Sequence, residues 1–226
     1  MKRHLIFYAV IVSLMATLPA CAGPLTYSAE AIEAKVIDAD TKRPLEGVIV
    51  VAHWQLEHGT VGGNVPTGQL RVMETVTDKD GKFSFSGFGP ETVWNSFLVN
   101  EDPRLLLFKS GYRYESLANE YNSSRELRTH PIRRSVWSGR TIALKKFKGS
   151  GEEWARHLSF LKTSLGFAYN GNNCEWKQIP HMLVAQHKEM LRLNEKQIFN
   201  TLQPVERVSG QKKCGSAQEF FRSYLQ

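Results

Sequence analysis

The sequence predicts a mainly β protein, in which a β-sandwich is followed by a small α-helical C-terminal region. Short runs of β-branched and aromatic residues recur between residues 33 and 148, with turn signals between them, as in a sandwich. Beyond Gly149 the apolar residues change to helical spacing. Of the 226 residues, 42% are hydrophobic and 23% are charged, which favours a folded chain over a disordered one.

The strongest strand signal is the dense apolar run over residues 47–54. Val50 and Trp54 fall on one face of this run, and Val51 and His53 on the other, so we expect a strand buried on both faces. Residues 57–70 are rich in glycine and predict a loop. Further strands are expected at residues 33–38, 71–77, 82–86, 92–99, 104–109 and 141–146.

The C-terminal third of the chain predicts helices at residues 152–165, 180–194 and 216–225. Glu152 and Glu153 open the first of them, where the helix dipole favours negative charge. Pro180 suits the first position of the second helix. We therefore divide the chain into a signal peptide (1–20), a tether (21–32), a β-sandwich (33–148) and an α-helical C-terminal region (149–226).

The N-terminus has the pattern of a signal peptide. Lys2 and Arg3 precede an apolar run over residues 5–18, which is shorter than the roughly 20 residues that a membrane-spanning helix needs. Residues 18–21 resemble a bacterial lipobox, which implies that Cys21 becomes lipidated and anchors the protein on the periplasm-facing side of an envelope membrane. Ala20 and Ala22 also satisfy the rule for ordinary cleavage, which would release a soluble periplasmic protein.

Two further cysteines, Cys174 and Cys214, follow Cys21. An oxidising compartment favours a disulfide between them, and two free thiols are the alternative. Neither cysteine lies in a Cys-x-x-Cys pair or beside a histidine cluster, so a structural zinc site is not expected.

The sandwich segment contains a recurring set of short motifs. They comprise an opening strand at residues 36–38, a turn with Pro-Leu-x-Gly-Val at residues 44–48, a Thr-Asp-x-x-Gly-x-Phe hairpin at residues 77–83 and a late Gly-Tyr at residues 111–112. With these motifs, residues 33 to about 148 resemble the carboxypeptidase regulatory-like domains. The resemblance implies a transthyretin-like (prealbumin-like) β-sandwich. Because each motif serves a turn or the core, it implies little about function.

A second resemblance supplies the alternative function, a metal-dependent enzyme. The strand around His53 is similar to the corresponding strand of intradiol ring-cleaving dioxygenases, which hold ferric iron with two tyrosines and two histidines. Residues 129–131 supply only His130 at the matching place, so the ligand set is incomplete. His53 and His58 are weak candidates for a metal site, and no cofactor is expected.

One basic segment, residues 125–148, suits an anionic ligand because arginines lie there around a tryptophan. The alternative is a solvated basic loop. The candidate residues are Arg125, Arg128, Arg133, Arg134, Trp137 and Arg140.

The sequence therefore predicts a non-catalytic binding or structural module of the bacterial cell envelope and no enzyme activity. Expected partners are the membrane, through the N-terminal lipid, and envelope proteins or anionic glycans. The formal net charge of +7, which becomes +5 when the two basic residues of the signal peptide are removed, would attract anionic partners. Nucleic acid is not expected, because an exported protein does not meet it by default.

Overall fold

The computed structural model describes residues 24–99, 101–120, 132–170, 173–208 and 212–225. The predicted signal peptide and Cys21 lie outside these residues. The strands are β1 (Leu25–Ala29), β2 (Ile32–Asp38), β3 (Ile49–Thr60), β4 (Gly63–Val76), β5 (Lys82–Phe85), β6 (Phe88–Val93), β7 (Phe97–Leu98), β8 (Arg104–Phe108), β9 (Glu115–Leu117), β10 (Ile132–Arg133) and β11 (Thr141–Leu144). The helices are α3 (Gly151–Ser164), α4 (Gly166–Asn170), α5 (Pro180–Glu195) and α6 (Ala217–Phe221), with short 3-10 turns η1 (Glu175–Gln178), η2 (Val205–Arg207), η3 (Lys212–Cys214) and η4 (Arg222–Tyr224).

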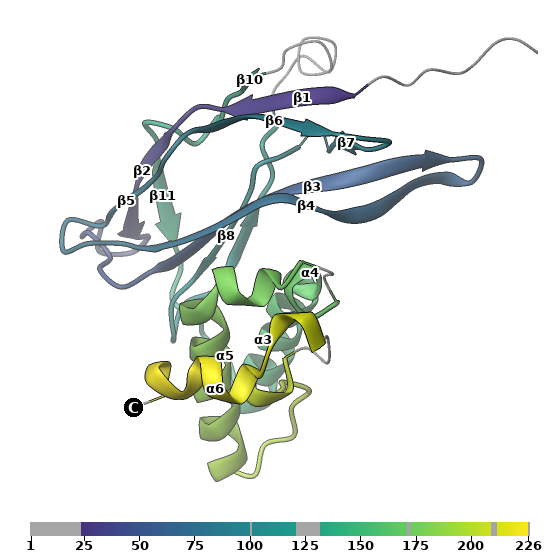
Figure 1. Ribbon diagram of the computed structural model, residues 1–226. Helices are drawn as coiled ribbons and strands as arrows, with labels where there is room; N and C mark the ends of the chain where they lie inside the picture. The colour runs from purple at the N-terminus through teal and green to yellow at the C-terminus, as the bar shows by residue number, and fades with distance from the viewer. Residues whose placement is uncertain (1–23, 100, 121–131, 171–172, 209–211, 226) are drawn as a thin grey trace, which may run out of the picture.

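These elements form three layers (Figure 1). The first layer contains two three-stranded sheets, β10-β1-β6 and β11-β2-β5. The second is the sheet β4-β3-β8-β9, with β7 paired to β3. The helices cover the outer face of this second sheet, so the predicted mainly β sandwich with a helical C-terminal region is confirmed.

Because the helices cover its outer face, the central sheet is buried on both sides. Val50 and Trp54 of β3 lie in the core between the sheets, whereas Val51 lies in the core between the sheet and the helices. Leu107 and Phe108 of β8 divide in the same way. Apolar residues on both faces of one strand therefore serve two different cores, as residues 47–54 predict.

The helices begin where the sequence predicts them. Ser150 caps α3 and forms a capping box with Glu153, and Pro180 occupies the first turn of α5. Leu158 and Leu161 of α3 are fully buried and share one core with residues of α5, α6 and the central sheet. The helical region and the central sheet thus bury their apolar faces against each other.

The prediction of a tether over residues 21–32 is wrong for its described part. Residues 25–29 form β1, which pairs with β6 on one side and β10 on the other. Tyr27 and Ala29 are buried in the core, whereas Thr26 is exposed and Ser28, between the two buried residues, is half-buried. The segment is short and half polar, and its partners lie far along the chain, so its local pattern carries little strand signal.

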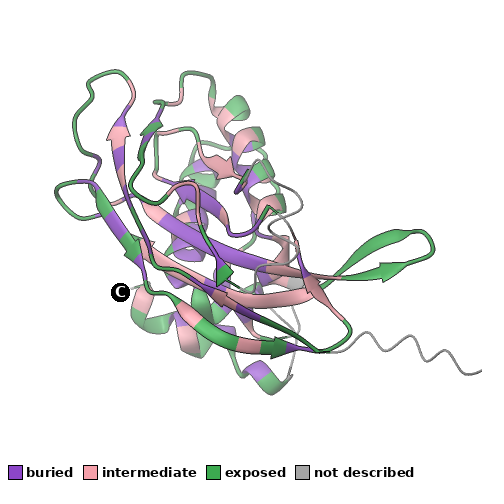
Figure 2. Cartoon of the chain, turned by 90° about the horizontal axis from the view of Figure 1, so that it is seen from above, coloured by how far each residue is buried: buried purple, intermediate pink, exposed green. Residues whose placement is uncertain are grey.

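The prediction of a loop over residues 57–70 is also wrong. β3 and β4 continue past the sandwich as one hairpin, paired from Glu57–Pro66 to Thr60–Gly63, and its outer part projects into solvent (Figure 2). Gly63 and Gly68 adopt positive φ, and the pairing register shifts twice, so glycines and bulges are accommodated within a ladder. Cross-strand pairing overrides the local glycine signal here.

The Thr-Asp-x-x-Gly-x-Phe hairpin motif acts as its residue types suggest. Asp78 Oδ1 accepts hydrogen bonds from the backbone N–H groups of Asp80 (2.9 Å) and Lys82 (2.8 Å). Gly81 has φ +72°, and a Cβ there would collide with the Val36 carbonyl. Phe83 then enters the sandwich core with 5% of its surface exposed.

Candidate ligand-binding pocket at the end of the sandwich

A pocket of about 640 Å³ lies at the end of the sandwich where the hairpin arm leaves it. It is bounded by β1, β10, β7 and the outer parts of β3 and β4. Concave sites of this size, with an apolar wall and a few polar groups, are typical of small-ligand binding. The lining residues are Leu25, Tyr27, Glu57, Asn64, Phe97, Leu98, Val99, Glu101 and Arg133.

Arg133 is the most informative residue of this pocket. It is only 2% exposed, and its guanidinium lies over the Tyr27 ring, 5.5 Å from the ring centroid. Its Nε and Nη1 atoms are buried and have no hydrogen-bond partner. Burial lowers the pKa of Arg133. A buried donor without an acceptor is costly, so this side chain favours an anionic group beside it.

Strand pairing places Arg133 at this position. β10 runs parallel to β1 with Arg133 opposite Ala29, and the Arg133 carbonyl accepts a hydrogen bond from the Glu30 N–H at 2.9 Å. Tyr27 is oriented from the other side, because its hydroxyl accepts a hydrogen bond from the Leu98 N–H at 3.3 Å. The pocket wall is therefore built from backbone-anchored residues on rigid strands.

Asp102 is a buried carboxyl close to this wall and is 2% exposed. Burial raises its pKa to about 7, against the lowering effects of a hydrogen bond from the Gln55 N–H and of the positive charges on Arg104 and Arg133. A charge that changes near neutral pH therefore lies within electrostatic range of Arg133. Perturbed groups of this kind concentrate at functional sites.

Glu57 and Glu101 line the same pocket, so it carries both signs of charge. Glu57 is half-buried, whereas Glu101 is exposed. Arg133 offers buried donors to a carboxylate, and the two glutamates offer acceptors to a cationic group. A ligand that carries a carboxylate together with an ammonium group complements this arrangement.

The predicted anionic-ligand residues do not share one surface. Arg125 and Arg128 lie outside the described residues. Arg133 is buried in the pocket, so the alternative of a solvated basic loop does not hold for this residue. Arg134, the next residue, points outward and pairs with Glu30 at 2.9 Å, because successive residues of a strand face opposite sides.

The other two members of that set also separate. Trp137 is half-buried and donates from Nε1 to the Ala118 carbonyl at 3.1 Å, so it serves packing. Arg140 is exposed and lines a different hollow, beside β2 and β5. Arg133 is thus the one described member of the set that enters the sandwich-end pocket.

The two weak metal candidates occupy different environments. His53 is 4% exposed, bonds through Nδ1 to Gln69 Oε1 at 3.0 Å and stacks on Phe167 at 4.6 Å, and burial lowers its pKa to about 4. His58 is exposed and its Nδ1 lies 2.7 Å from the Asn95 carbonyl. Within the described part of the chain, no three acidic, histidine or cysteine side chains are placed to hold a metal ion. His130 lies outside the described residues.

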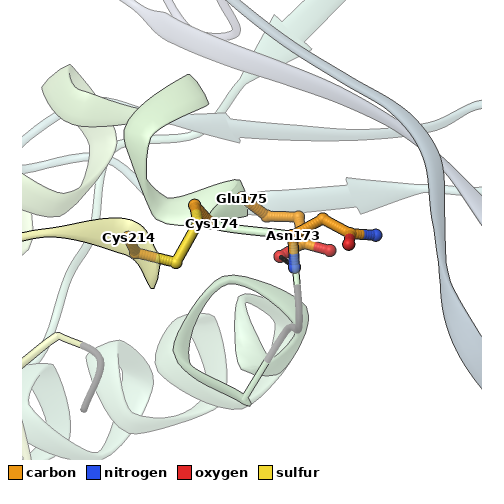
Figure 3. Close-up of a disulfide and its surroundings, with 4 residues drawn as sticks. All are labelled: Asn173, Cys174, Glu175 and Cys214. Atoms are coloured by element: carbon orange, nitrogen blue, oxygen red, sulfur yellow. Dashed lines mark hydrogen bonds between the residues drawn. A yellow bond between two sulfur atoms is a disulfide. The ribbon is translucent and has the colours of Figure 1, made fainter. Parts of the chain in front are cut away.

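The predicted disulfide is confirmed. Cys174 and Cys214 are bonded, with their Cα atoms 5.5 Å apart (Figure 3). The bond joins the residue that precedes η1 to the last residue of η3 and so closes the helical region on itself. Among the described residues, no helix has the length and apolar character needed to cross a bilayer.

Comparisons with known proteins give likenesses of fold alone. No family model matches the sequence, and no curated protein matches it. The chain is similar to 3-chlorocatechol 1,2-dioxygenase from Rhodococcus opacus 1CP, with 12% identity, a TM-score of 0.30 and coverage of 57% of this chain and 64% of that one. It is also similar to the pilus 2b backbone protein of group B streptococcus, with 18% identity, a TM-score of 0.26 and coverage of 52% and 41%.

A third likeness is to the dioxygenase domain of a dioxygenase carbohydrate-binding protein fusion from Streptomyces sp. SirexAA-E. It has 15% identity, a TM-score of 0.28 and coverage of 58% of this chain and 86% of that domain. The chain therefore spans less than two thirds of the first two structures, at 64% and 41% of their lengths. At these TM-scores the likenesses carry no argument about activity.

Sequence reasoning missed most of this pocket. Tyr27 lay in the expected tether, Glu57 in the expected loop, and Asp102 in no motif at all. Only Arg133 carried a signal, as part of a basic segment. The pocket is assembled from five separate stretches of chain, so no local pattern could have indicated it.

Proposed function

We propose that the protein is a non-catalytic binding module of the bacterial cell envelope, held at a membrane through a lipid on Cys21. Its sandwich-end pocket binds a small zwitterionic ligand, such as an amino acid or a short peptide with free termini. The observation that carries the proposal is the buried Arg133 guanidinium, whose Nε and Nη1 have no partner in a pocket that two glutamates also line. The carboxylate of the ligand forms hydrogen bonds with Arg133, and the ammonium group of the ligand lies toward Glu57 and Glu101.

Arg133→Gln is expected to weaken the binding of alanyl-alanine at least tenfold, because a charge-assisted hydrogen bond of about 1.5–3 kcal/mol is lost. Isothermal titration calorimetry measures the effect with three probes: alanyl-alanine, its C-terminal amide and its N-acetyl form. The amide lacks the carboxylate and should bind as poorly to the wild type as the dipeptide does to the variant. Arg140→Gln, the same charge change at an exposed site, is the matched control and should bind normally.

A second variant distinguishes a true loss of binding from misfolding of Arg133→Gln. Glu57→Gln should weaken alanyl-alanine but tighten the N-acetyl form, since one carboxylate that repels an anion is gone. Such opposite shifts cannot result from unfolding. Equal affinity for all three probes, or no effect of either variant on binding, would contradict the proposal.

The affinity for alanyl-alanine is expected to fall as the pH rises through about 7. Below this value the carboxyl of Asp102 is protonated, because its pKa is raised to about 7, so Asp102 carries no charge that attracts Arg133. Above it, the Asp102 carboxylate competes with the ligand carboxylate for Arg133. Titrations between pH 5.5 and pH 7.5, which lie within roughly 1.5 units of this pKa and below the α-amino pKa of about 7.7–8.0, measure the trend. Asp102→Asn should flatten it, and an affinity that rises with pH would contradict the assignment.

A further inference from the structure

A second pocket, distinct from the sandwich-end pocket, lies between β4 and η1. It has a volume of about 380 Å³ and is formed where the edge of the central sheet meets the helical region. Side-chain amides and one ion pair dominate its wall. The lining residues are Gln69, Leu70, Arg71, Val72, Glu91, Asn173, Glu175 and Gln178.

Glu175 is the residue that indicates a ligand here. It is 2% exposed, and its Oε2 accepts a hydrogen bond from the Asn173 N–H at 3.0 Å (Figure 3). Its Oε1 is buried and has no hydrogen-bond partner. A buried carboxylate oxygen of this kind requires a donor, because an unpaired polar atom costs desolvation energy.

The same pocket also contains a buried donor that has no acceptor. Arg71 forms an ion pair with Glu91 through Nη2, which leaves its buried Nε–H without an acceptor. The pocket therefore offers one unpaired acceptor, on Glu175, and one unpaired donor, on Arg71. Hydroxyl groups both donate and accept, so a ligand that carries several of them can supply a donor to Glu175 and an acceptor to Arg71.

The lining of the pocket carries charges of both signs, so neither a bare cation nor a bare anion is matched on every side. A cation would also face the Arg71 guanidinium, and an anion would face Glu91 and Glu175. The amides of Gln69, Asn173 and Gln178 can each donate and accept, as hydroxyl-rich ligands require. We infer that this pocket binds a neutral saccharide through its hydroxyl groups.

The disulfide holds this pocket in shape. Cys174 lies between Asn173 and Glu175 and has a left-handed φ of +62°, so the two lining residues flank a bonded cysteine. Figure 3 shows Asn173 and Glu175 beside the Cys174–Cys214 bond. Rigid placement of polar groups lowers the cost of ordering them around a ligand.

Saturation-transfer NMR and calorimetry with maltose, cellobiose and lactose test this inference. At least one of these disaccharides should bind. Gln178→Leu and Glu175→Gln should each lower its affinity by about three- to tenfold, the loss expected for one hydrogen bond. Gln178 is exposed, so its variant should fold normally. Gln218→Leu, an equally exposed glutamine on α6 outside the pocket, is the matched control and should leave the affinity unchanged.

Three results would overturn the inference. They are no binding by any of the three sugars, equal binding by the pocket variants and the control, and stronger binding of the cationic probes glucosamine or calcium than of any of the three sugars. The last result would mean that Glu175 takes a cation and that hydroxyl groups are not required. Binding of alanyl-alanine at the sandwich end is measured separately, so either site can fail without the other.

Discussion

Replacing both Cys174 and Cys214 with serine is expected to lower the free energy of unfolding by about 3–4 kcal/mol. The disulfide spans a sequence separation of 40 residues, and opening this loop returns conformational entropy to the unfolded chain. Serine leaves no reactive thiol behind. Urea denaturation, followed by far-ultraviolet circular dichroism, gives the change from the shift in midpoint at constant slope.

The loss of the disulfide should destabilise the whole helical region. Cys214 is 2% exposed and belongs to the core shared by the helices and the central sheet, and it precedes α6, which carries the buried Phe221. Wild-type protein unfolded in the presence of a reductant is the control and should show a similar loss. An unchanged midpoint in both experiments would show that packing alone holds the C-terminal segment in place.

Phe108→Ala is expected to destabilise the protein by about 3–5 kcal/mol, the usual cost of emptying a fully buried phenylalanine site. Phe108 is 0% exposed and lies in the core between the central sheet and the helices, where its ring stacks on Trp154 at 6.4 Å. Because β8 is central to both cores, little relaxation can refill the cavity. Thermal and urea unfolding measure the loss.

Phe199→Ala provides the matched control, since Phe199 is 87% exposed and the same atoms are removed from a solvated site. Its effect should stay within about 0.5 kcal/mol. We also expect Phe108→Ala to unfold in one transition, because residues of the sheet and of the helices share one core. A loss below about 1 kcal/mol, well under the usual range, would show that the helices do not pack tightly on the sheet.

Local chemistry explains the parts of the fold that the sequence predicted well. The hairpin at Asp78 and Gly81 needs a side-chain acceptor and a positive φ within a few residues, so its signal is contained in the motif itself. The cap at Ser150 and Glu153 is equally local. The burial of residues 47–54 on both faces follows from an apolar run that has no polar side.

Pairing partners far along the chain explain the parts that were missed. The segment predicted as a tether becomes β1 only because β6 and β10 supply its hydrogen bonds, and the glycine-rich stretch becomes a hairpin arm only through the cross-strand ladder of β3 and β4. Strand formation depends on such contacts more than on intrinsic preference. Sequence patterns within a few residues therefore do not predict these strands.

The sequence by itself determined the class of fold and the starts of α3, α5 and α6, and it favoured the cysteine pair that bonds. Only the tertiary structure decided which polar side chains meet. In the sequence, Arg133 is one of several arginines in a basic segment. Only the pairing of β10 with β1 turns it inward, beside Tyr27. Glu175 likewise becomes an unpaired acceptor only when η1 packs on β4. The physical reason is that burial and desolvation are properties of the packed chain, so neither can be assigned to a residue before its distant neighbours are in place.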